Sequence, residues 1–297
     1  METNSTQVEQ SPHFSREYRI AGYAGVFLLS FTIFLVLTFP YDLLMQGALY
    51  RLKSKVPVPI KAEKMVPSII PFGLKMDKVT IGPVSENNQA TILLDSLTIR
   101  ASLFKALSKK IEASVNGKLS GGDISGDIKN DAISGNATFK ITSIGIQPLL
   151  ALAPKIPFQI SGDVSGNGKF HWNKFKPIEN TGELHLTSSS VDMPNFDLKI
   201  IRANFHFNKV EADIELLKGG ILKINTLNLE GEPCGFEVTG SITLVKDSFA
   251  NSSLDLEIVL HPTKEFESQV PIAILQKDDR GFYSGRLRGT FNNPTFP

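Results

Sequence analysis

The sequence IPFQISGDVSGNGKFHW, residues 156–172, decides the fold, because its residues alternate strictly between two kinds. Every even position is apolar or glycine, and every odd position from 159 to 171 is polar. Successive side chains of a strand point to opposite faces, whereas a helix repeats about every 3.6 residues. The stretch therefore predicts a β-strand with one apolar face and one solvated face.

The same alternation continues on both sides of this stretch. Toward the C-terminus it predicts strands around residues 182–186, 205–207, 210–216, 222–229, 236–244, 254–260 and 283–291. Toward the N-terminus it predicts strands around 133–141, 92–99 and 74–81, with short helices at 103–107 and 147–152. One-sided strands with a turn about every ten residues are typical of an antiparallel meander.

Several glycines fall on the apolar face, where a packing side chain is expected. These glycines are Gly135, Gly162, Gly166, Gly168, Gly240, Gly285 and Gly289. One interpretation is strand-end turns or bulges. The other is a sheet that curls so tightly that its concave face has no room for side chains there. A curled sheet encloses either an apolar groove or a packed core, and the periodicity does not distinguish the two.

Residues 20–39, IAGYAGVFLLSFTIFLVLTF, form an uncharged apolar run near the N-terminus. A helix of this length spans about 30 Å, the thickness of the hydrocarbon core of a bilayer. A secretory signal peptide has a shorter apolar region and ends in a small-residue cleavage site, which the TFPY sequence at 38–41 does not offer. The run therefore predicts an uncleaved membrane anchor, preceded by a disordered polar tail over residues 1–19.

Four residues mark the membrane junction after the anchor: Phe39, Pro40, Tyr41 and Asp42. Pro40 ends the helix or lies at its interfacial end, and aromatic rings suit the headgroup region. Residues 40–55 predict either a continuation of the anchor or an amphipathic juxtamembrane helix capped by Asp42. Basic residues lie on both sides of the anchor, so charge leaves the orientation open; we favour a cytoplasmic N-terminus.

The composition argues against several functional classes. The net charge is +1, with both signs interspersed, which gives no electrostatic basis for binding nucleic acid. Cys234 is the only cysteine in the sequence, so an intrachain disulfide is excluded. The five histidines lack metal-ligand spacing, and no nucleophile elbow or phosphate-binding loop occurs. We therefore expect a protein without catalytic activity, metal or cofactor.

Three sequence features together resemble one protein family. They are the junction LTFPYDLL at 37–44, the segment LFKALSKKIEASVNGKLSGGDISGDI at 103–128, and the ending GFYSGRLRGTFNNPTFP at 281–297. Over residues 20–297 the chain is similar to the type II secretion system protein N family (GspN), within the AsmA-like group of membrane-anchored envelope proteins. The resemblance implies a single-pass protein of the bacterial inner membrane, with a periplasmic β-domain over residues 56–297.

The resemblance also implies a function. Members of this family are accessory, non-catalytic components of the type II protein secretion machinery, so the β-domain is expected to act in assembly or in docking onto other secretion-machinery proteins. AsmA-like relatives imply an alternative, in which a hydrophobic β-groove binds or transfers lipid and shields phospholipid acyl chains. A hydrolase is a distant third hypothesis, since the sequence shows no convergent nucleophile and base.

Together these inferences predict a mainly β fold: one transmembrane helix, then an elongated, curled antiparallel sheet with a few short helices. The sheet is expected to be AsmA-like, either an open groove or a flattened barrel. The apolar face of the strands supplies the candidate groove-lining residues. They are Ile156, Phe158, Ile160, Val164, Phe170, Trp172, Leu184, Leu186, Phe205 and Phe207.

Overall fold

The computed structural model describes Phe27, Ser30 and residues 60–69, 72–82, 91–102, 110–150, 159–197, 202–245, 248, 251–269 and 276–295. The chain divides into two compact units, residues 1–52 and 53–297. In the first unit Phe27 and Ser30 are helical. Within the described ranges, no helix has both the length and the apolar character needed to cross a bilayer. The rest of the predicted tail, anchor and juxtamembrane helix lies outside the described residues.

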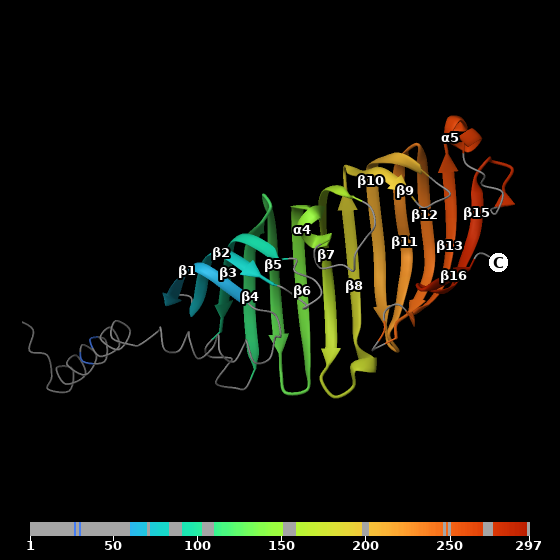
Figure 1. Ribbon diagram of the computed structural model, residues 1–297. Helices are drawn as coiled ribbons and strands as arrows, with labels where there is room; N and C mark the ends of the chain where they lie inside the picture. The colour runs from blue at the N-terminus through green and yellow to red at the C-terminus, as the bar shows by residue number, and fades with distance from the viewer. Residues whose placement is uncertain are drawn as a thin grey trace, which may run out of the picture. The chain divides into compact units, whose positions relative to one another are not determined.

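The second unit is built on a single antiparallel sheet, which confirms the predicted meander. Figure 1 shows the strands following one another in chain order. The strands of the N-terminal half are β1 (Ile60–Ile69), β2 (Phe72–Ile81), β3 (Ile92–Ala101), β4 (Ile111–Leu119), β5 (Gly122–Asn130), β6 (Ser134–Gly145) and β7 (Ser161–Asn173). Those that follow are β8 (Thr181–Ser188), β9 (Val191–Asp197), β10 (Arg202–Leu217), β11 (Ile221–Glu232), β12 (Cys234–Thr243), β13 (Ser253–Pro262), β14 (Gln276–Lys277), β15 (Tyr283–Thr290) and β16 (Asn293–Thr295).

Short loops make this order of strands possible. Ser120 and Gly121, between β4 and β5, both have positive φ, and so do Gly219 and Gly220 between β10 and β11. Two successive residues of positive φ match the right-handed twist of the strands they join, which favours tight hairpins. Because each hairpin returns the chain beside the strand it has just left, pairing is almost entirely between sequence neighbours.

Strand β9 departs from the simple meander. β8 pairs with the C-terminal half of β10, from Val210 to Leu216, and β9 pairs with the N-terminal half. β9 also pairs with the start of β7, at Ser161 and Gly162. β9 thus occupies the position that β8 is too short to fill, and the ladder between β7 and β10 is completed by two strands instead of one.

The helices among the described residues are few and short. They are α4 (Ile146–Leu150), α5 (Lys264–Gln269) and a 3₁₀ turn at Pro177–Glu179. The predicted helix at 147–152 corresponds to α4 as far as residue 150. The predicted helix at 103–107 lies outside the described residues. The strand expected over 156–172 begins at Ser161, since Gln159 and Ile160 are not in a strand and residues 151–158 are outside the described part.

The core consists of three clusters on the apolar face. The first extends from β2 to β6 and includes Met76, Leu94 and Ile144. The second contains the rings of Phe205 and Phe207, and the third includes Leu254 and Leu256 of β13. The first cluster therefore reaches the strands in the middle of the sheet, whereas the third draws its buried residues from β11 and β13.

Candidate functional site: the apolar face of the sheet

The register of the strands joins the apolar residues into one face. Across the middle of the sheet, Ile124 pairs with Ile141, Ile141 with Gly166, and Gly166 with Leu186. Farther along, Ile214 pairs with Ile224. Directly opposed residues of antiparallel strands share a face, so these positions form a continuous apolar surface. The alternation predicted from the sequence is thus in phase from strand to strand.

This surface is open to solvent in its central part. Ile128, Phe139 and Phe170 are 37%, 36% and 36% exposed, although each lies on the apolar face. Trp172, Leu184 and Leu186 next to them are only partly buried. We call these six residues on β5 to β8 the central apolar strip. Large apolar side chains that are gathered on one surface and left uncovered are typical of a binding surface.

Aromatic rings in the strip lie flat over glycines of the neighbouring strand. Phe139 is paired with Gly168, and a Cβ added to that glycine would lie 2.5 Å from Phe139 Cζ. Trp172 is paired with Gly135, and a Cβ there would lie 2.1 Å from Trp172 Cζ2. The rings of Phe170 and Trp172 are stacked, with centroids 6.0 Å apart. Glycine at these positions lets the rings pack directly against the backbone of the neighbouring strand.

Another close approach explains Gly166. A Cβ at Gly166 would lie 2.2 Å from the carbonyl oxygen of His185 on β8. Gly240 has a φ of 131°, and a Cβ there would lie 2.2 Å from the carbonyl oxygen of Asp255. In both cases a carbonyl oxygen of the adjacent strand lies so close to the glycine that no space is left for a side chain. Several of the glycines noted in the sequence are therefore places of close strand approach.

The apolar face is closed on the C-terminal side of the strip by an aromatic cluster. Phe205 and Phe207 are 3% and 1% exposed, and their rings stack with centroids 5.8 Å apart. Phe266 of α5 packs on Phe205 at 5.9 Å, edge to face. Phe236 and Phe196 complete the cluster, at 5.5 Å and 5.4 Å from the Phe205 ring. A ligand could reach these rings only if α5 and its neighbours moved.

The structure places the predicted groove-lining residues in three settings. Phe170, Trp172, Leu184 and Leu186 belong to the open strip. Ile160, Phe205 and Phe207 belong to the aromatic cluster, and Val164 is partly buried opposite Ile144. Ile156 and Phe158, like the junction residues Phe39, Pro40, Tyr41 and Asp42, lie outside the described residues.

Two strip residues were not among the predicted groove-lining residues: Ile128 and Phe139. Phe139 carried a detectable signal, because it lies in the regular alternation from Gly135 to Ile141. Ile128 follows the same alternation in β5, after Ile124 and Gly126. The register that places Phe139 opposite Gly168 could not be predicted from the sequence, since the pairing of residues 29 positions apart depends on the intervening turns.

The opposite face is polar and carries ion pairs between residues of neighbouring strands. Asp255 accepts two hydrogen bonds from Arg286, from Nε and Nη2, both at 2.7 Å. These bonds hold the pKa of Asp255 below its ordinary value of 3.8. Lys209 Nζ lies 3.1 Å from Glu230 Oε1 and 3.3 Å from Glu211 Oε1. Such exposed pairs fix side chains across the ladder but contribute little individually to stability.

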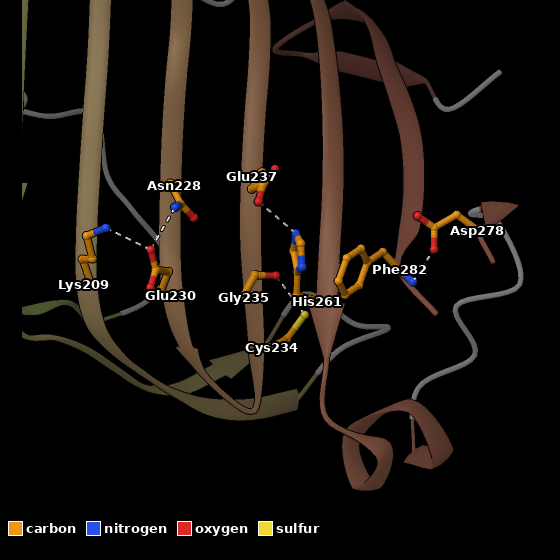
Figure 2. Close-up of polar contacts among 9 residues, drawn as sticks. All are labelled: Lys209, Asn228, Glu230, Cys234, Gly235, Glu237, His261, Asp278 and Phe282. Atoms are coloured by element: carbon orange, nitrogen blue, oxygen red, sulfur yellow. Dashed lines mark hydrogen bonds and ion pairs between the residues drawn. The ribbon is translucent and has the colours of Figure 1, made fainter. Parts of the chain in front are cut away.

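The described histidines are held by neighbours on this polar side. His171 Nδ1 is 2.8 Å from Asn136 Oδ1, and His206 Nδ1 is 2.6 Å from Asp192 Oδ1. Figure 2 shows His261 beside Glu237, with Nε2 at 3.2 Å from Oε1, and beside Phe282, whose ring is tilted by 49° with its centroid 4.1 Å away. No group of three or more His, Cys, Asp or Glu able to hold a metal ion occurs in the described ranges.

Cys234 is fully buried at the start of β12, beside the aromatic cluster. Its Sγ donates to the carbonyl oxygen of Gly235 at 3.2 Å, as Figure 2 shows. Burial raises the pKa of the thiol to about 11. A thiol that is protonated and inaccessible behaves as a small packing residue.

A shallow hollow of about 460 Å³ lies across β6, β7, β8 and β10. Its lining includes Phe170 of the strip, together with Ala137, Gly182 and Leu216, which are paired with one another across these strands on the apolar face. The hollow therefore lies partly on the apolar face and includes part of the central apolar strip. In comparisons with known proteins, no family model, no curated protein and no solved structure matches the chain.

Proposed function

We propose that this protein is a membrane-anchored, non-catalytic lipid-binding protein, and that its sheet shields acyl chains on the central apolar strip. The observation that carries the proposal is the strip itself: large apolar side chains on the inner strands of the sheet are left about one-third exposed. In a sheet with only a core to form, these positions would be covered, as they are on either side.

An acyl chain suits the form of this surface. The strip extends over β5 to β8 and carries no charged group, because the charged residues of these strands lie on the opposite face. Burial of each methylene group contributes about 0.8 kcal/mol, so a chain laid along several strands gains affinity without any specific polar contact. In this proposal the sheet curls around the chain as an open, AsmA-like groove, and residues 20–39 anchor it in the bacterial inner membrane with the sheet in the periplasm.

The type II secretion role is the second candidate, and one observation favours it. Among the described strands, β1 has a hydrogen-bonded neighbour on one side only, at β2. It is ten residues long, which is enough to add a strand from another protein. In this version the sheet docks onto secretion-machinery proteins through its free edge. Deleting the gene would then impair export of the secreted substrates and leave the envelope lipids unchanged; normal export would exclude this role.

The lipid proposal is tested by analysing the full-length protein purified from its membrane. We expect co-purified phospholipid, quantified after extraction, that falls when Phe139 and Phe170 are both changed to serine. Both residues are partly exposed, so the double variant should still fold. The control is Phe291→Ser, the same chemical change at a residue after β15 that is 40% exposed and lies outside the strip. Equal lipid content in wild type, double variant and control would contradict the proposal.

A further inference from the structure

One edge of the sheet carries exposed apolar side chains at the tips of its loops. Ile133 follows β5, and Phe175 and Ile178 lie in the loop between β7 and β8. They are 58%, 76% and 67% exposed, more than any residue of the central apolar strip. Exposure of this degree costs free energy in water, so three such side chains on adjacent loops call for a partner.

The loop that carries Phe175 and Ile178 is held in one conformation. Asn173 Oδ1 accepts hydrogen bonds from the backbone N–H groups of Phe175 and Lys176, at 3.0 Å and 3.1 Å. Asn180 Oδ1 accepts from the N–H of Asn173 at 2.9 Å. Lys176 Nζ lies 3.1 Å from Glu179 Oε1. The loop is therefore held by its own hydrogen bonds, and the side chains of Phe175 and Ile178 are exposed to solvent on an ordered segment.

Backbone hydrogen bonds join this loop to its neighbours. The N–H of Lys174 donates to the carbonyl oxygen of Ile133 at 2.9 Å, and the N–H of Gly219 donates to that of Ile178 at 2.7 Å. The turns after β5, β7 and β10 thus form one contiguous surface, at the lower edge of the sheet in Figure 1. We call this surface the loop edge and define it by residues 131–133, 174–180 and 218–220.

Lysines surround the apolar tips. Lys129, Lys174, Lys176 and Lys218 are all exposed on or beside the loop edge. The nearby carboxylates are already engaged: Asp131 Oδ1 accepts from the N–H groups of Ile133 and Ser134, and Glu179 is bound by Lys176 and Asn173. Three of the described turns at the other ends of the strands are different. Residues 120–121, 188–190 and 232–233 contain no large apolar side chain and no lysine.

We propose that the loop edge docks on the surface of an anionic lipid bilayer. Phe175, Ile178 and Ile133 would enter the boundary between headgroups and acyl chains, and the lysines would contact lipid phosphates. A protein partner fits less well, because lysine is depleted in the centre of protein interfaces, whereas here Lys174 and Lys176 flank Phe175 and Lys176 lies two residues before Ile178. The inference uses residues outside the central apolar strip and stands whether or not the strip binds lipid.

The test measures whether the loop tips enter the acyl region. Cys234 is buried, so a thiol-reactive environment-sensitive fluorophore labels only an introduced cysteine. The full-length chain carries the label at Ile178→Cys or, at the opposite edge, at Ser189→Cys. Each protein is incorporated into phosphatidylcholine vesicles containing phosphatidylglycerol and acyl-brominated lipid. We expect quenching of the label at 178 and little at 189; equal, water-like emission at both positions would overturn the proposal.

A second arm tests the chemistry of the contact. Phe175→Ser in the protein labelled at 178 should reduce the fraction of docked label about tenfold, as expected for loss of one inserted aromatic side chain. Leu93→Ser, which removes an apolar side chain that is 59% exposed on β3, outside the strip and the loop edge, should leave docking unchanged. Omitting phosphatidylglycerol or raising the salt concentration should also weaken docking. Docking that is insensitive to Phe175 and to lipid charge would exclude this surface as the contact.

Discussion

At the scale of single residues, the close fit of glycine and aromatic ring on neighbouring strands makes a sharp prediction. In Gly135→Ala, the new methyl group would overlap the ring of Trp172, which must leave the sheet surface. Overpacking of this kind typically costs about 1–3 kcal/mol. We expect a lower melting temperature and altered emission of Trp172, the only tryptophan in the sequence. Gly145→Ala is the control, because its Cβ would meet nothing closer than 3.6 Å.

The pair of Asp255 and Arg286 predicts a dependence on pH. The pKa of Asp255 is lowered from 3.8 chiefly by the hydrogen bonds from Arg286, so folding favours the ionised carboxylate. Its contribution to stability is therefore present above pH 3.8 and is lost as the pH falls through the lowered pKa. Asp255→Asn should lower the melting temperature at neutral pH, and the difference from wild type should shrink in acid.

Melting curves from neutral pH down to about pH 3 measure this effect. The matched control is Asp123→Asn, an exposed carboxylate on the polar face of β5. A difference between Asp255→Asn and wild type that stayed constant over the whole pH range would show that the ion pair does not act through ionisation.

Once the register is known, irregularities of the strands can be matched to the residue spacing in the sequence. The apolar alternation slips by one residue after Phe207, after Ile224 and after Ile141, and each slip coincides with a shift of register. A bulge adds a residue to one strand and so restores the correct face for the next apolar side chain. The sequence separated residues 205–207 from 210–216 as two strands, whereas the bulge keeps them in the single strand β10.

At the scale of elements, α5 makes the next prediction. Phe266 is 5% exposed and packs edge to face on Phe205, so α5 covers the aromatic cluster. Phe266→Ala should lower the free energy of unfolding by about 3 kcal/mol, within the range for losing a buried aromatic side chain. Chemical denaturation measures the loss. Glu265→Ala, an exposed change on the same helix, should have a small effect; equal effects would mean that α5 is not a packing element.

Most elements could be predicted from alternation, because a strand with one buried face leaves a period of two in the sequence. β9 could not. It is defined by pairing with both β10 and β7, a consequence of β8 being shorter than β10. α5 was missed as well, since six residues are too few for a helical period to show. The open strip was only partly predictable, because the same apolar pattern produces the covered residues Phe205 and Phe207 and the open residue Phe170.

At the scale of the whole molecule, pairing between sequence neighbours limits how far a perturbation can spread. Within the sheet unit, the first core cluster takes its buried residues from β2 to β6 and the third from β11 and β13, so no strand contributes to both. Stability in such an array is a sum of local terms and nearest-neighbour contacts. A core substitution at one end should therefore loosen that end and leave the other folded.

Leu94→Ala and Leu254→Ala test this with one chemical change at equivalent depth, since the two residues are 5% and 4% exposed. Each should lose about 2–5 kcal/mol of local stability. Hydrogen exchange followed by mass spectrometry should show faster exchange in β2 to β4 for Leu94→Ala, and in β12 to β15 for Leu254→Ala. Because the variants are reciprocal, each is the control for the other. Uniformly faster exchange along the whole sheet in both would mean that the unit unfolds as one cooperative body and that the central strip transmits strain between its flanks.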